Sequence, residues 1–221
     1  MALLFILFFG FLLMKMPVAF CMICSSMIYS LVHGESINML LSRAVAGSSS
    51  FTLLALGFFI LAGNIMNRGG VTDRIFGFCE KLVGWIPGGL GHANIVASVI
   101  FAGMSGSAVA DAGGLGAIEI KAMKDAGYEE EFAVAVTGAS SCIGPIIPPS
   151  ISAVVFAVAS GVSIGKMFIG GILPGLVMAL TLMIYVYIIS KKRNYPRTPF
   201  PKMGELGRSF IQSFPALLTP V

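Results

Sequence analysis

The stretch that decides the fold runs from His92 to Lys124 and reads HANIVASVIFAGMSGSAVADAGGLGAIEIKAMK. It consists of two apolar arms joined by the polar sequence GMSGSAVAD. An arm of about 13 residues rises only about 20 Å as an α-helix, whereas the hydrocarbon core of a bilayer is about 30 Å thick. The stretch therefore predicts a re-entrant helical hairpin at 92–124, whose two arms enter the membrane and leave it on the same side.

The composition of the whole chain indicates a membrane protein. Of the 221 residues, 57% are hydrophobic and 11% are charged, whereas soluble domains carry about 25% charged residues. We therefore expect an all-α integral membrane protein with the lipid bilayer as its surroundings. The net charge of +4 does not indicate a nucleic-acid partner, because the basic residues lie at the ends of apolar segments and form no patch interleaved with aromatic residues.

Charge placement gives an independent check on the hairpin. Lys and Arg collect on the cytoplasmic side of membrane proteins. If Lys15 is cytoplasmic and 92–124 were a single span, Lys121, Lys124 and the basic cluster at 191–193 would all lie outside. A hairpin places all of them inside. We therefore expect both ends of the 92–124 stretch on the cytoplasmic side.

A second irregular stretch, ASSCIGPIIPPS at 139–150, interrupts the apolar run from 132 to 159. Its three prolines, glycine and three serines would leave backbone groups unpaired at mid-membrane, which is costly in hydrocarbon. Such backbone is tolerated where it is buried in protein or lines an aqueous site, and discontinuous helices build the sites of many secondary transporters. We therefore expect a broken helix at 128–160, with its break facing the hairpin tip.

The helix ends at these two irregular stretches predict a sodium site. The first hairpin arm ends near Gly103 and the first half of the broken helix ends near Cys142, so two sets of free carbonyl groups converge. The candidate sodium ligands are the hydroxyl groups or backbone of Ser105, Ser107, Ser140, Ser141, Gly144 and Pro145. This set contains no full carboxylate, which suits Na⁺ better than calcium.

The opposite helix ends favour an anion. The second arm begins after Ser107 and the second half helix begins near Pro148 and Pro149, where proline suits the first turn. Helix N-termini attract anionic groups such as a substrate carboxylate. The candidate substrate-binding residues are Gly106, Asp111, Pro148 and Ser150. Asp111 is an intramembrane acid and hence a functional candidate, although pairing with a lysine or the backbone to stabilise the tip is an alternative role.

An intramembrane hydrolase is the alternative from a different functional class. The sequence GMSGS is similar to a nucleophile elbow, but its fifth position is Ser107 instead of glycine, no strand precedes it, and no histidine lies close in sequence. The spacing of a catalytic metal site is also missing from the sequence. We therefore expect a carrier and not an enzyme.

Four motifs together resemble the large membrane subunit of tripartite ATP-independent periplasmic (TRAP) transporters. They are GMSGSAVADAGGLG, GASSCIGPIIPPS, MPVAF and FILAGNIMNRGG. The resemblance implies a multi-pass protein of the bacterial inner membrane in a sodium-driven uptake system for organic acids such as sialic acid or C4-dicarboxylates. It also implies a small membrane subunit, a periplasmic substrate-binding protein and an elevator-like motion. Serine-rich hairpin tips also occur in divalent-anion/sodium symporters, which remain an alternative.

The resemblance also implies a domain organisation. The large subunit of this family has two inverted repeats, and this chain supplies one hairpin and one broken helix, so it resembles the N-terminal half. We expect scaffold helices at 1–68, an amphipathic arm helix at 69–86, a transport unit at 87–193, and a linker to the second repeat at 194–221. Within the transport unit, a helix at 166–192 follows the hairpin and the broken helix. The arm helix is expected to stay at one membrane depth while the hairpin moves.

Overall fold

The computed structural model describes residues 2–48, 57–58, 61, 65, 69–201 and 203–217. Over these residues the regular structure is entirely helical, as the sequence predicted. The chain forms two compact units, Met1–Leu54 and Ala55–Val221. Most of the apolar segment at 51–66, which the sequence assigns to the scaffold, lies outside the described residues.

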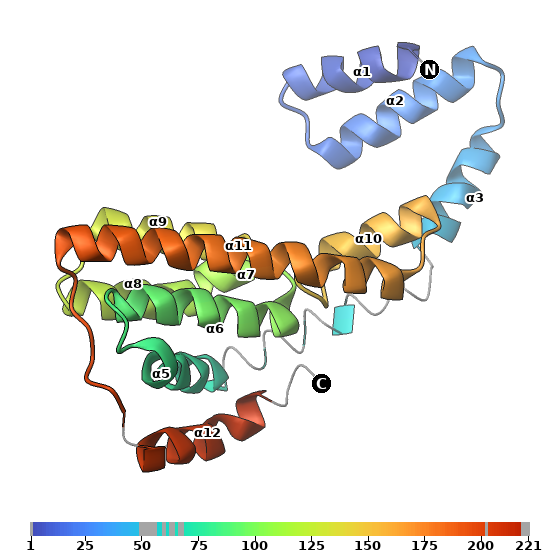
Figure 1. Cartoon of the computed structure of the whole chain (residues 1–221). Helices are drawn as coiled ribbons and strands as arrows, with labels where there is room; N and C mark the ends of the chain where they lie inside the picture. Colours follow the sequence, from blue (N-terminus) through green and yellow to red (C-terminus); the bar gives the residue numbers. More distant parts are fainter. Residues whose placement is uncertain are drawn as a thin grey trace. The chain divides into compact units, whose positions relative to one another are not determined.

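The first unit contains α1 (Ala2–Leu13), α2 (Val18–Val32) and α3 (Ile37–Ser48). Helices α1 and α2 lie side by side and are joined by a short turn (Figure 1). Lys15 takes a left-handed conformation in this turn, and Pro17 occupies the N-cap of α2. Helix α1 is apolar all round and buries no residue, a pattern that suits contact with lipid or with further protein.

The second unit is built around one long helix. Its helices are α5 (Val71–Val83), α6 (Gly89–Ser105), α7 (Ala108–Gly113), α8 (Leu115–Asp125), α9 (Glu130–Ser141), α10 (Ile151–Ser160), α11 (Ile164–Arg193) and α12 (Met203–Leu217). Helices α6 and α9 lie along one half of α11, and α10 lies along the other half (Figure 1). The tip of the hairpin and the break between α9 and α10 therefore both lie near the middle of α11.

Helix α11 alone among the described helices is long and apolar enough to cross a membrane. Its 30 residues correspond to a rise of about 45 Å. Much of its apolar surface is exposed, including Ile169 at 74% and Leu173 at 70%. An exposed apolar helix of this length suits contact with hydrocarbon.

The hairpin has the expected order but a more complex second arm. Helix α6 is the first arm, and α7 with α8 forms the second, which returns along α6. Gly114 separates α7 from α8, so the second arm is interrupted where the sequence predicted one helix. The first arm has 17 residues and rises about 25 Å, somewhat more than predicted. Its re-entrant placement in a bilayer stays a prediction.

Several contacts bring the two outer ends of the hairpin to the same end of the unit. Lys124, at the end of α8, pairs with Glu130 at 2.8 Å, and Arg193, at the end of α11, pairs with Glu129. Gly88, just before α6, lies against Ser190 of α11. The basic ends of α8 and α11 therefore gather at one end of the unit, as the charge argument requires of a hairpin.

An aromatic cluster holds this end together. The rings of Tyr128 and Tyr195 stack with their centroids 4.5 Å apart, and Phe132 packs on Tyr195 at 4.9 Å. Burial raises the pKa of Tyr128 to about 12, so its hydroxyl stays protonated and donates to the Pro196 carbonyl at 3.0 Å. The chain leaving α11 is thereby fixed to the start of α9.

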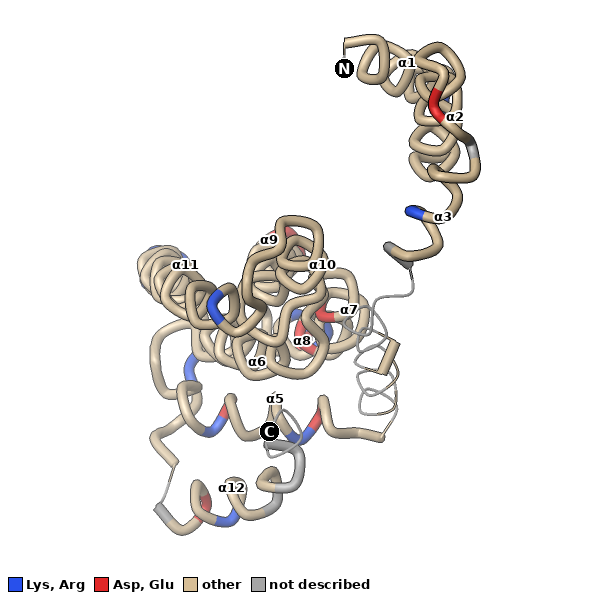
Figure 2. The backbone as a smooth tube through the Cα atoms, turned by 90° about the vertical axis from the view of Figure 1, so that its right-hand side faces the viewer, with Lys and Arg blue, Asp and Glu red and all other residues tan. Residues whose placement is uncertain are grey.

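The amphipathic helix expected at 69–86 is α5, which packs on the hairpin. Ile75 and Cys79 of α5 share a core with Phe101 of α6 and Leu115 of α8. Acidic and basic residues are spread along α5 and α12 (Figure 2). The charged side chains on α5 that face away from the core are Asp73, Arg74 and Lys81.

The segment at 194–221, expected to be a linker, contains the amphipathic helix α12. Ser213 of α12 donates a hydrogen bond to the Arg74 carbonyl of α5 at 3.0 Å. The rings of Phe78 and Phe210 lie with their centroids 5.8 Å apart. Helix α12 therefore packs on α5, next to the core that α5 shares with the hairpin.

Candidate functional site

The hairpin tip and the helix break touch each other. At the tip, Gly106 lies against the Pro149 carbonyl and the backbone of Ser150. From the other side, a Cβ atom added to Gly144 would lie 3.4 Å from the Ser107 carbonyl oxygen. The two irregular stretches, 38 residues apart at Gly106 and Gly144, therefore form one contact region, which we call the tip–break site.

The C-terminal ends of α6 and α9 both point into the tip–break site, but several of their carbonyl oxygens already accept a backbone hydrogen bond. Gly106 takes a left-handed conformation at φ 57° and its N–H donates to Ala102. After α9, the N–H groups of Ile143 and Gly144 donate to the carbonyls of Ser140 and Ser141 at 2.9 and 3.1 Å. A carbonyl oxygen has two lone pairs, so each of these oxygens keeps one for a cation.

The four candidate serines of the sodium site differ in their surroundings. Ser105, Ser140 and Ser141 are buried, whereas Ser107 is partly exposed. Ser107 caps α7 by accepting a hydrogen bond from the Ala110 N–H at 3.4 Å. Ser141 donates to the Thr137 carbonyl at 2.7 Å. The structure thus gives each of the four hydroxyl groups a different set of protein partners, and the Ser140 hydroxyl is directed to Asn94 of α6.

Ser140 belongs to a buried network that sequence reasoning missed. It donates to the Asn94 side-chain oxygen at 2.6 Å, and the Asn94 amide donates to the Thr137 hydroxyl at 2.7 Å. All three side chains are buried, and the network joins the first hairpin arm to α9. Asn94, an amide within an apolar arm, was the signal in the sequence.

Helix α10 begins at a serine cap, whereas the sequence predicted prolines in its first turn. Ser150 is the N-cap and accepts a hydrogen bond from the Ala153 N–H at 3.1 Å. Pro148 and Pro149 precede the cap, so the expectation that they occupy the first helical turn is wrong. A serine hydroxyl can accept a bond from an N–H group that the helix leaves unpaired, which favours it at the cap.

Asp111 lies beneath the tip and is 1% exposed. Ser98 and Ser141 are its nearest hydroxyl neighbours, but neither forms a hydrogen bond of good geometry with its carboxylate. Glu119 of α8, which sequence reasoning missed, is also 1% exposed. Glu119 lies two residues before Lys121, in the second half of the second arm.

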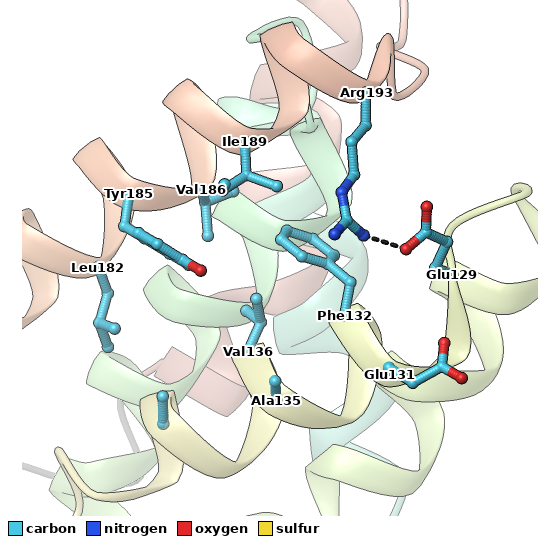
Figure 3. A pocket seen from close by; sticks show the side chains of 11 residues that line it. Glu129, Glu131, Phe132, Ala135, Val136, Leu182, Tyr185, Val186, Ile189 and Arg193 are labelled. Carbon is cyan, nitrogen blue, oxygen red and sulfur yellow. Dashed lines mark hydrogen bonds and ion pairs between the residues drawn. The ribbon is translucent and has the colours of Figure 1, made fainter.

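A separate hollow lies between α9 and α11, toward the end of the unit where Arg193 and Glu129 pair (Figure 3). Its volume is about 570 Å³. Its walls are mostly apolar, with Phe132 and Val136 from α9 facing Val186 and Ile189 from α11 (Figure 3). This hollow contains none of the predicted site residues.

The residues that the structure describes include no group of three His, Cys, Asp or Glu side chains placed to bind a metal ion together. The tip–break site offers serine hydroxyls and backbone carbonyls. A family model for the DctM component of tripartite ATP-independent periplasmic (TRAP) transporters matches residues 5–221. The chain belongs to this family.

Curated members of the DctM family resemble this chain over most of its length. The sialic acid TRAP transporter large permease protein SiaM of Vibrio cholerae is 47% identical over 96% of this chain and 50% of the relative. The sialic acid TRAP transporter permease protein SiaT of Haemophilus influenzae (strain 86-028NP) is 48% identical over 93% of this chain and 33% of the relative. The C4-dicarboxylate permease DctM of Vibrio cholerae is 43% identical over 90% of this chain and 44% of the relative.

The family predicted from the hairpin and break motifs is thereby confirmed. The chain spans about a third to a half of the length of these DctM-family relatives. The relatives are named as permeases and not as enzymes, which agrees with the rejection of a hydrolase.

Proposed function

We propose that this chain is the N-terminal half of the permease subunit of a sodium-driven TRAP uptake system for organic acids, in the bacterial inner membrane. The observation that carries the proposal is the contact between the hairpin tip and the helix break, in a member of the DctM family. Two helix C-termini with available carbonyl lone pairs, next to buried serine hydroxyls, suit a sodium ion. The start of α10, capped by Ser150, suits a carboxylate.

The substrate is an organic acid, with sialic acid as the first candidate. Two relatives at 47% and 48% identity are named for sialic acid, and one at 43% is named for C4-dicarboxylates. All of these compounds carry carboxylate groups that a helix N-terminus can bind. The system would include a small membrane subunit and a periplasmic substrate-binding protein.

The transport step is an elevator-like motion of the hairpin and the broken helix, which together form the tip–break site. Helix α5 would remain at one membrane depth, because moving its exposed charges through hydrocarbon is costly. Since α5 shares a core with α6 and α8, the motion requires both hairpin arms to slide past α5.

Reconstituted uptake tests the proposed function. The full-length permease with its small subunit and cognate binding protein should take up labelled sialic acid only when a sodium gradient points into the proteoliposomes. Replacing external sodium with choline should reduce uptake to the level of empty liposomes, and other organic acids in excess should reveal the preferred substrate. Uptake at the same rate in choline would contradict sodium coupling, and no uptake of any acid in the panel would contradict the substrate class.

Cysteine labelling tests the hairpin topology. In a background without the four native cysteines, a cysteine at exposed Lys124 should react with a membrane-impermeant maleimide only from the cytoplasmic side. The matched control is a cysteine at exposed Lys166, near the opposite end of α11, which should react from the periplasmic side. Ready labelling at position 124 from the periplasm would exclude a hairpin with both ends inside.

A further inference from the structure

Two carboxylates are buried together beneath the hairpin tip. Asp111 of α7 and Glu119 of α8 are each 1% exposed, and their charges are close enough to interact. None of their four carboxylate oxygens has a hydrogen-bond partner among the described residues. Helices α6 and α9 pack on α7 and α8, so the surrounding protein shields the pair from water.

The described residues provide no positive charge for this pair. The two ion pairs that the structure describes join Lys124 to Glu130 and Arg193 to Glu129, on side chains that are substantially exposed. On the α5 side, Cys79 approaches Glu119, but burial and then the charge of Glu119 raise its thiol pKa to about 12, so the thiol is neutral. An ionised carboxylate buried without a partner destabilises a fold by several kcal/mol, so either a bound cation or protons must offset the charge of this pair.

A third group points to a ligand at the same place. Ser98 of α6 is 1% exposed, its hydroxyl has no hydrogen-bond partner, and it is a neighbour of Asp111. One turn earlier on α6, Asn94 lies next to Glu119. Its side-chain oxygen accepts from Ser140 and its NH₂ group donates one hydrogen to Thr137, and it forms no hydrogen bond with Glu119. The unpartnered oxygens of Ser98, Asp111 and Glu119 thus come from three different helices.

We infer that Asp111, Glu119 and Ser98 form a second sodium site, beneath the hairpin tip and separate from the helix ends of the tip–break site. One Na⁺ would offset one of the two negative charges, and the Ser98 hydroxyl, which has no other partner, can donate to a remaining Asp111 oxygen. The three side chains offer five oxygens, fewer than the six to eight that calcium takes, so we assign the site to Na⁺. A substrate carboxylate is excluded here, since it would be repelled by both acids.

This inference rests on burial and charge, and it holds or fails independently of the tip–break site. The test measures ²²Na⁺ binding to the purified full-length permease in wild type and in the variants Asp111→Asn and Glu119→Gln. Each amide keeps the shape of the side chain and removes its charge. The number of bound sodium ions should fall by one in either variant, whereas a Gly144→Leu variant should lose the separate ion at the tip–break site.

Two further measurements make the result decisive. The matched controls Asp125→Asn and Glu130→Gln change exposed acids of the same region and should bind as many sodium ions as wild type. In sodium-free choline, Asp111→Asn and Glu119→Gln should melt at a higher temperature than wild type, because an uncompensated buried charge has been removed. Sodium should then raise their melting temperature less than it raises that of wild type.

Unchanged sodium binding in both amide variants would overturn the inference and would leave protons as the groups that neutralise the pair. A lower melting temperature of both variants in choline would also overturn it, since the carboxylates would then have protein partners. If Gly144→Leu bound as many sodium ions as wild type while each amide variant lost one, the proposed sodium site at the tip–break contact would be refuted. The second sodium site would then be supported.

Discussion

Replacing Gly144 with leucine is expected to reduce sodium-coupled uptake about 100-fold, equivalent to about 2.7 kcal/mol. Gly144 is buried in the break, and a Cβ atom there would lie 3.3 Å from both the Ser107 carbonyl carbon and the Ser141 carbonyl oxygen. The longer leucine side chain must push the hairpin tip away from the break. The measurement is the initial rate of sialic acid uptake under a fixed sodium gradient.

The matched control is Gly138→Leu, one turn and a half earlier in the same segment. Gly138 is an exposed residue of α9, and a Cβ atom there would meet nothing within 4 Å. Leucine favours the helix over glycine by up to about 1 kcal/mol, so this variant should fold and transport as wild type does.

A Pro145→Leu variant should lose the coupling of uptake to sodium, because leucine allows α9 to continue into the break. Wild-type uptake in both Gly144→Leu and Pro145→Leu would show that the break does not hold the ion.

The second large effect is expected at the tip, where Gly106 adopts φ 57°. An L-residue in this left-handed conformation costs about 1 to 2 kcal/mol, and the alanine Cβ would also overlap the Pro149 carbonyl. Gly106→Ala should therefore separate the tip from the break, lower the melting temperature, and remove most of the sodium-dependent thermal stabilisation.

The control for the tip is Gly113→Ala. Gly113 lies in α7 with ordinary helical geometry and with nothing within 4 Å of an added Cβ atom. Alanine there should leave sodium-dependent stabilisation unchanged and raise the melting temperature slightly. If Gly106→Ala responded to sodium as Gly113→Ala does, close contact at the tip would not be needed for ion binding.

The sequence predicted the two irregular stretches because their residues cannot continue a helix. Pro145, Pro148 and Pro149 interrupt the helix at the break, and the glycine between two serines marks the tip. Their contact could be expected from half-length arms and from the placement of Lys and Arg. These arguments need only local chemistry and the thickness of a bilayer.

Other features depended on which helix faces pack together, and the sequence does not state this. Glu119 follows an apolar residue in AIEIK, and only the packing of α8 on α9 and α6 shows that it is buried beside Asp111. The interruption at Gly114 was missed, although the pair Gly113–Gly114 is a known turn signal. Helix α12 was missed because the family resemblance implied only a linker to a second repeat at 194–221, although Leu206, Phe210 and Ser213 follow a helical spacing.

The network of Asn94, Thr137 and Ser140 illustrates the same limit. Thr137 and Ser140 are unremarkable in the sequence, because polar side chains commonly form hydrogen bonds between membrane helices, and Asn94 alone stands out as an amide within an apolar arm. Only the structure shows that the three lock the first hairpin arm to α9, one turn before the break.

The central claim is that a sodium ion binds where the hairpin tip meets the helix break. A cryo-electron microscopy map of the full-length permease in sodium, compared with one in choline, tests it most directly. We expect density in sodium between Ser105 to Ser107 and Ser141 to Pro145, at about 2.3 to 2.6 Å from serine and carbonyl oxygens, and none there in choline. Sodium-driven uptake by the same preparation, with no density at this place in either map, would contradict the claim.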